Sequence, residues 1–259
     1  MAASLQSTSE GQTLILTLSN PAHQNALGLE IYAAGIEALG AAEKNPEVRS
    51  VVITGEGAVF CAGENLEQLQ ARRRQAPEVQ VQSLEGLHNW LDAIHTYPKP
   101  VIAAVEGLAA GAGFSLALAC DFIVAADNAA FSMPYSTVAL SPDGGGSWCL
   151  ARSLPRALAS ELLMTAERIS AQRLHSLGVI NRVSSAGQAL HAALELAERL
   201  NARAPNALAS TKELINDAPA HTLSQHMDSE AHHFVLNLHH PNAGEGMEAL
   251  VQKRPAHYR

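Results

Sequence analysis

Two glycine-containing turns, at residues 60–66 and 107–114, have the composition and placement of an anion-binding site. Each carries the chain from an apolar run into the start of a helix. The first N–H groups of a helix lack intrahelical acceptors, and the helix dipole is positive there. Glycine permits positive φ and lets the backbone approach a ligand closely. Two such turns facing one point would stabilise an oxygen that gains negative charge during a reaction.

Asp143 is the candidate acid–base residue. It lies in the segment SPDGGGSW at 141–148, before a glycine turn that should open a helix at about Ser147. The local pattern favours a turn or helix-capping role, because Asp-Gly is a common turn pair. A carboxylate beside an oxyanion site could instead remove a proton from one carbon and return it to another.

Short apolar strands and amphipathic helices alternate along the chain and would position these residues. Strands are expected at 13–18, 50–54, 101–105, 122–126, 131–133 and 179–183. Helices are expected at 29–42, 65–74, 81–95 and 114–120, and mainly helical structure follows from residue 156. This pattern indicates an α/β fold, a spiral of strand–strand–helix units over about the first 190 residues, followed by a helical C-terminal part.

Composition and patterning exclude several functional classes. The net charge of -8 argues against nucleic-acid binding through overall positive charge. Three widely spaced cysteines, Cys61, Cys120 and Cys149, argue against a disulfide framework and fit a reducing compartment. No signal-peptide pattern or apolar run of about 18 residues is present. We therefore expect a cytoplasmic protein with no nucleic-acid, membrane or metal partner.

The two turns are similar to the signature regions of a known family. FCAGENL at 60–66 and KPVIAAVEGLAAGAGFSLALACDFIVAA at 99–126 resemble those of the enoyl-CoA hydratase/isomerase (crotonase) superfamily. The resemblance implies a crotonase-like spiral of ββα units at 1–195, which holds the CoA and oxyanion site. It also implies a C-terminal helical trimerisation region at 196–259. An acyl-CoA substrate, no separate cofactor, and a homotrimer or dimer of trimers follow from the same resemblance.

The resemblance assigns roles to individual positions. The oxyanion donors would be the backbone N–H groups of Glu64 and Ala112, with no role for the Glu64 side chain. Contacts to the substrate and its CoA are implied for Ala62, Gly63, Asn65, Leu66, Gly111, Tyr135 and, from a neighbouring subunit, Lys253. The basic run at 72–74 and Arg254 could also approach the CoA phosphates, although such a run is usually a solvated face.

The sequence departs from the family's hydratases at both of their catalytic glutamates. Ser115 stands at the first position and Tyr135 at the second, and neither can activate water unaided near neutral pH. The stretch 109–148 is more similar to the ring-epoxyphenylacetyl-CoA isomerases, which use the aspartate of a PD-x-GG segment. The resemblance implies an acyl-CoA isomerase, acting by proton shift or epoxide-to-oxepin rearrangement, with Asp143 as acid and base.

Other assignments stay open. The chain could be a hydratase-like enzyme, or a dehalogenase- or hydrolase-like enzyme in which Asp143 is the nucleophile and His88 the base. It could also be a non-catalytic CoA-binding relative. On its own pattern, His88 is interpreted as a residue on the polar face of a helix. In the isomerase hypothesis, Asp143 should lie in a mostly apolar pocket near Tyr135 and Phe131, and burial should raise its pKa above about 3.9.

Overall fold

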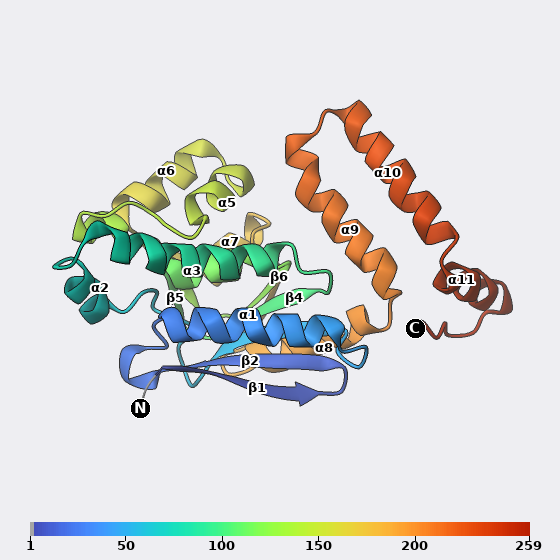
Figure 1. The fold of residues 1–259 in the computed structure, drawn as a ribbon, viewed down its shortest axis with the longest axis horizontal. Coiled ribbons are helices and arrows are strands. Elements are labelled where there is room, and N and C mark those ends of the chain that lie inside the picture. Colours follow the sequence, from blue (N-terminus) through green and yellow to red (C-terminus); the bar gives the residue numbers. More distant parts are fainter. Residues whose placement is uncertain (1–2) are drawn as a thin grey trace.

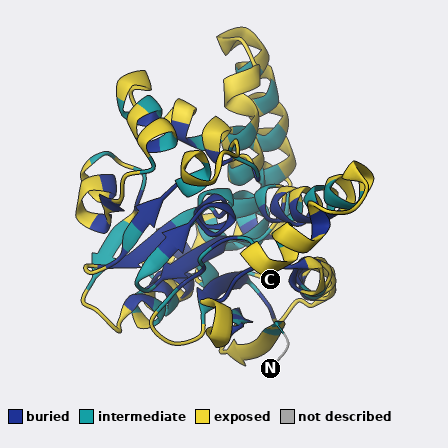
Figure 2. Ribbon diagram, turned by 90° about the vertical axis from the view of Figure 1, so that its left-hand side faces the viewer, coloured by how far each residue is buried: buried dark blue, intermediate teal, exposed yellow. Residues whose placement is uncertain are grey.

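The computed structural model describes residues 3–259 and consists of a two-sheet core with a helical arm that projects from one end (Figure 1). Within the described residues, no helix is long and apolar enough to cross a bilayer. Buried residues concentrate in the strands and the helices packed on them, whereas much of the arm is exposed (Figure 2).

The larger sheet has six strands in the order β1-β2-β3-β4-β6-β9. Their bounds are β1 Ser4–Glu10, β2 Thr13–Ser19, β3 Ser50–Gly55, β4 Val101–Val105, β6 Phe122–Ala126 and β9 Arg182–Ser184. The β1–β2 pair is antiparallel and the other neighbours are parallel. Every residue of β4 is buried, as expected for a parallel strand covered on both faces.

The smaller sheet contains β5 (Leu108–Ala110), β7 (Ala130–Ser132) and β8 (Ile169–Ser170), in that order. The chain passes from β4 to β5 and then into helix α4 (Ala112–Ala119), and from β6 to β7 in the next turn. An isolated parallel bridge joins Cys61 to Ala109 of β5. The segment after β3 therefore runs alongside the smaller sheet, as β5 and β7 do after β4 and β6. The expected spiral of ββα units is confirmed.

Helices cover both faces of the larger sheet. Besides α4, the helices that precede the arm are α1 Leu29–Lys44, α2 Leu66–Arg72, α3 Pro77–His95, α5 Gly146–Ser153, α6 Arg156–Thr165, α7 Ala171–Ser176 and α8 Ala189–Asn201. Of these, α2, α5 and α6 pack mainly on other helices. The side chains of α1 and α3 belong to the main core, with Trp90 fully buried. On the other face, Ala193, Leu196 and Ala197 of α8 pack with residues of β3, β4 and β6.

The arm consists of α9 (Pro205–Asp217), α10 (Leu223–Leu238) and α11 (Pro241–Gln252). Lys212 fixes α9 to the core, because its Nζ lies 2.9 Å from Asp121 Oδ2 and donates to Ile94 O at 2.9 Å. The expected boundary between 195 and 196 falls inside α8, which packs on the sheet. The helical arm therefore begins later than the sequence pattern suggests.

The strand predictions for β4 and β6 match the structure residue for residue, but the one at 179–183 is displaced. Val179 N donates to Leu174 O at 3.0 Å and closes the preceding helix, so sheet pairing begins only at Arg182. The polar edge strand β1, of sequence SLQSTSE, was not expected because it presents no apolar face. The short β5 lies inside what the pattern presents as a glycine turn.

Candidate active site

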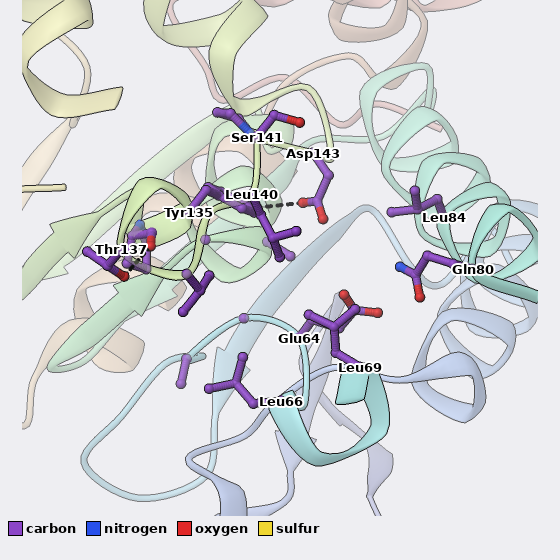
Figure 3. Close-up of a pocket in the computed structure, with 18 of the residues that line it drawn as sticks. Glu64, Leu66, Leu69, Gln80, Leu84, Tyr135, Thr137, Leu140, Ser141 and Asp143 are labelled. Carbon is purple, nitrogen blue, oxygen red and sulfur yellow. Dashed lines mark hydrogen bonds between the residues drawn. The ribbon is translucent and has the colours of Figure 1, made fainter. Parts of the chain in front are cut away.

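A cavity of about 610 Å³ lies where the two glycine turns meet the segment that follows β7. The turns contribute Ala62–Glu64 on one side and Gly111 with Ala112 on the other. The remaining wall comes from α2, α3, the 3-10 helix η2 (Pro134–Val138) and residues 140–145. Figure 3 shows these side chains converging from separate parts of the chain.

Backbone hydrogen bonds hold the two glycine turns together. Cys61 N donates to Leu108 O at 3.0 Å, and Ala110 N donates to Cys61 O at 2.9 Å. Gly63 has φ +96°, and a Cβ at this position would lie 2.8 Å from Ala110 O and 3.4 Å from the Ala112 nitrogen. Glycine is required here because both positive φ and the close approach exclude a side chain.

The backbone amides of Glu64 and Ala112 are free to bind a ligand. Ala112 is the first residue of α4, so its N–H has no intrahelical acceptor. Within residues 3–259, neither the Glu64 N–H nor the Ala112 N–H donates a hydrogen bond to a protein acceptor. The cavity therefore holds two unsatisfied donors beside one another, which is the arrangement that an oxyanion requires.

Asp143 faces this cavity, and its side chain does not cap a helix. The Tyr135 hydroxyl donates to Asp143 Oδ1 at 2.6 Å (Figure 3). The N-cap of α5 is Gly145, with no side-chain capping bond. Ser115 Oγ donates to the Asp143 main-chain carbonyl at 3.1 Å and is itself buried. Ser115 thus supports the Asp143 backbone. The helix-capping interpretation of Asp143 is wrong. The turn interpretation is confirmed, because Gly146 N donates to Asp143 O at 3.4 Å.

Burial raises the pKa of Asp143, while the Tyr135 hydrogen bond and nearby His88 lower it in part. The expected direction is therefore confirmed. Burial and the neighbouring Asp143 charge raise the pKa of Tyr135, so it stays a neutral donor at physiological pH. Phe131, expected next to Asp143, instead packs on Phe114 with ring centroids 4.9 Å apart and is fully buried. His88 is exposed, but it lines the cavity rather than only a solvated helix face.

The structure brings most of the nominated residues together. The cavity wall includes Ala62, Gly63, Glu64, Leu66, Gly111, Ala112, Tyr135 and Asp143. The Asn65 side chain instead caps α2, where it accepts from the N–H groups of Glu67 and Gln68. Lys253 is exposed at the end of α11 and does not line the cavity of its own chain. A role for Lys253 at the CoA stays a prediction that needs a second subunit.

Two of the basic residues considered for the CoA phosphates are engaged within the chain. Arg72 is buried and pairs with the Glu64 carboxylate. Arg254 binds both carboxylate oxygens of Glu245, at 2.7 and 2.9 Å. Among residues 3–259, no group of three or more His, Cys, Asp or Glu side chains is arranged to hold a metal ion.

Sequence reasoning expected pocket walls from residues around 70–85 but did not identify which side chains of α3 would form them, and it gave the Glu64 side chain no role. Gln80 and Leu84 line the cavity one helical turn apart on the same face of α3. Their i, i+4 spacing was visible, but nothing local indicated which side of the helix would face a ligand. The Glu64 carboxyl was assigned no role, yet it projects into the cavity (Figure 3).

Replacing Tyr135 by Phe should move the acid limb of the pH–rate profile to higher pH. The hydroxyl favours ionised Asp143, so its loss should raise the pKa of that carboxyl further. Activity that depends on the ionised base falls as pH drops through this pKa, and that fall should begin at higher pH. At the plateau we expect a loss of about tenfold. An unchanged profile would show that Tyr135 does not support the base.

The ββα spiral, with two free amides beside a partly buried carboxylate, defines a protein of the crotonase fold. A sequence model described as "Enoyl-CoA hydratase/isomerase" matches residues 8–259. The chain belongs to the enoyl-CoA hydratase/isomerase family.

Known relatives and solved structures agree with this assignment. The carnitinyl-CoA dehydratases of Salmonella enteritidis and Salmonella typhimurium are each 38% identical, over 98% of this chain and 97% of theirs. The crystal structure of an enoyl-CoA hydratase from Polaromonas sp. JS666 is 75% identical, with a TM-score of 0.98, over 99% of this chain and 100% of that one. An enoyl-CoA hydratase from Mycobacterium tuberculosis is 30% identical, with a TM-score of 0.89, over 98% of each chain.

Proposed function

We propose that this crotonase-family enzyme is an acyl-CoA isomerase in which Asp143 is the acid and base. The observation that carries the proposal is the pair formed by Asp143 and Tyr135 at 2.6 Å, in the same cavity as the free amides of Glu64 and Ala112. No cofactor other than the CoA of the substrate is required by this chemistry.

The proposed reaction uses the amides and the carboxylate in sequence. The N–H groups of Glu64 and Ala112 would hold the thioester oxygen, and Asp143 would remove the α-proton. The resulting enolate is stabilised because its charge develops on an oxygen that two fixed donors already face. Return of a proton to another carbon completes a 1,3-shift. In a ring-epoxide substrate, the same acid would assist C–O cleavage and rearrangement to the oxepin.

Mass spectrometry of an acyl-CoA panel, run with purified protein in deuterated water, tests this proposal. An isomerase should introduce deuterium without adding the mass of water. Crotonyl-CoA hydration should stay near background, because Ser115 is buried against the Asp143 carbonyl and Tyr135 is a neutral donor. A hydration rate like that of a hydratase with two glutamates would contradict the isomerase proposal.

Water elimination or addition is the second candidate. The carnitinyl-CoA dehydratase relatives support it, since they span nearly the whole chain at 38% identity. Those relatives are named for loss of water from an acyl-CoA, so the panel should include 3-hydroxyacyl-CoA and carnitinyl-CoA thioesters. Loss of water from either compound, with no deuterium shift in the unsaturated ones, would favour this candidate over isomerisation.

We also propose that the arm assembles the protein into a trimer or a dimer of trimers. Large apolar side chains on α10 and α11 are exposed, and they are Leu223, Met227, Phe234, Val235, Leu236, Leu238, Met247, Leu250 and Val251. Burial against another subunit would remove this surface from water. Light scattering should give three or six times the mass of one chain, and a stable, fully active monomer would contradict this.

A further inference from the structure

A second cavity, of about 670 Å³, adjoins the active-site cavity, and we call it the side lobe. Five residues line both spaces, and they are Leu66, Leu69, Gln80, Val138 and Leu140. Figure 3 shows Leu66, Leu69, Gln80 and Leu140 around the opening that the two spaces share. Because the same side chains bound both spaces, a ligand held at the amides of Glu64 and Ala112 can continue into the side lobe.

Hydrocarbon forms most of the wall of the side lobe. Its apolar residues are Leu66 and Leu69 of α2, with Val138, Ala139 and Leu140 at the end of η2 and just beyond it. Leu66, Val138 and Leu140 are 60%, 50% and 49% exposed. A ligand that covers these side chains removes their apolar surface from water, which favours binding of a hydrocarbon chain.

The side lobe also contains a guanidinium that has no partner in the chain. Arg73 ends α2 and lines the lobe together with Gln70 and Gln80. Within residues 3–259, the Arg73 side chain forms no ion pair and donates no hydrogen bond to a protein acceptor, whereas Arg72 is paired with Glu64. The described residues that line the lobe include no Asp or Glu. An anion in the lobe would therefore meet a positive charge and no opposing carboxylate.

The spacing along α2 places this charge at the end of the lobe that is farther from the oxyanion donors. The lining residues Leu66, Leu69, Gln70 and Arg73 follow the pattern i, i+3, i+4, i+7 and share one face of the helix. A helix rises about 1.5 Å per residue, so Arg73 lies about 10 Å along the axis from Leu66. A chain that extends along this face from the Glu64 amide contacts leucine first and the guanidinium last.

We infer that the side lobe binds the distal part of the acyl group and that Arg73 binds a carboxylate at its end. The substrate class is then a linear acyl-CoA with a second, terminal carboxylate. The inference rests on the proposed binding of an acyl-CoA at the two amides, and it holds for isomerisation and for loss of water alike. One guanidinium matches one carboxylate, with which it can form two parallel hydrogen bonds. The CoA nucleotide, with its several phosphate charges, suits neither the apolar wall nor a single cation.

The test compares octanoyl-CoA with octanedioyl-CoA, which differ only in having a methyl or a carboxylate at the end of the chain. Both are saturated, so titration calorimetry with the full-length protein measures affinity without net turnover. Arg73→Gln should weaken octanedioyl-CoA binding about tenfold, because a charge-assisted hydrogen bond is lost. Octanoyl-CoA and free CoA should stay within about twofold of wild type, since neither places a carboxylate in the lobe.

Arg74→Gln is the matched control. Arg74 is the next residue, is exposed and lines neither cavity. The substitution removes the same charge from the same segment, and it should leave the affinities for both thioesters unchanged.

A charge exchange gives an independent measurement. Arg73→Glu should weaken octanedioyl-CoA further and should bind ω-aminooctanoyl-CoA more tightly than octanedioyl-CoA, which reverses the wild-type preference. A residue that only stabilises α2 would not exchange one preferred end group for the other. Unchanged preference in Arg73→Glu would overturn the inference.

Two results with Arg73→Gln would also overturn it. Equal weakening of octanedioyl-CoA, octanoyl-CoA and free CoA would show that Arg73 binds the CoA phosphates. An unchanged affinity for octanedioyl-CoA would show that its carboxylate lies elsewhere. Failure of the proposed function is visible separately, because turnover would then survive Asp143→Asn while the Arg73 preference persists.

Discussion

Replacement of Asp143 by Asn should lower turnover by about 10²–10⁴-fold while acyl-CoA binding changes little. The Asn side chain can still accept the Tyr135 hydrogen bond, which is 2.6 Å long in the structure. It cannot accept the substrate proton, so the loss should fall on kcat rather than on binding. Steady-state kinetics and titration calorimetry with a non-reactive acyl-CoA measure the two quantities. Retained turnover in the Asn variant would defeat the assignment of Asp143 as the base.

The same substitution should not destabilise the protein at neutral pH. The pKa of Asp143 is raised above its ordinary 3.8 by burial, so the folded state binds this proton more tightly than the unfolded state. The stabilisation that results is full below the unfolded pKa and is lost as pH rises through the folded pKa. At pH 7 the buried charge is unfavourable, and Asn removes it. The free energy of unfolding should therefore be equal or higher.

Asp92→Asn is the matched control for both measurements. Asp92 is exposed on α3 and does not line the cavity. Turnover and urea unfolding should both stay close to wild type, within about 0.5 kcal/mol for stability. A large loss of turnover in the control would show that activity responds to charge in general rather than to Asp143.

Gly113→Ala should lower kcat/KM by about 10²–10³-fold, because it separates the two glycine turns. A Cβ at Gly113 would lie 2.4 Å from Cys61 O and 2.8 Å from Cys61 Sγ. Cys61 O already accepts from Ala110 N at 2.9 Å, so the added methyl pushes directly on the contact that joins the turns. Displacement of either turn would move the N–H group of Glu64 or Ala112 away from the thioester oxygen and weaken its hydrogen bond in the transition state.

Urea unfolding should show a destabilisation of about 1–3 kcal/mol for Gly113→Ala, as expected for overpacking of a buried contact. Gly40→Ala is the control, since Gly40 is exposed on α1 and a Cβ there meets nothing within 4 Å. It should keep full activity and gain up to about 1 kcal/mol, because alanine restricts the unfolded chain. A fully active Gly113→Ala protein would argue against an oxyanion site formed by these turns.

The amino-acid sequence alone determined the order of the elements and the location of the site along the chain. The all-apolar run Val101–Val105, short and β-branched and preceded by Pro100, predicted a strand buried on both faces, and the structure has β4 at those residues. The glycines at 63 and 111 marked turns that need positive φ, and both adopt it. These features are local, because apolar runs and glycine act on the backbone within a few residues.

Tertiary structure alone decided which side chains face one another. Asp143 begins a turn, as its sequence indicates, since Gly146 N donates to its carbonyl. Only the fold places the Tyr135 hydroxyl of η2 against its side chain. The Glu64 carboxyl lines the cavity and pairs with Arg72 at the end of α2. The smaller sheet joins Cys61 to Ala109 across 48 positions, and so places the two free amides side by side. Such contacts depend on packing between segments far apart in the sequence. The helix and strand periodicities show which residues share a face, but they do not show what that face will contact.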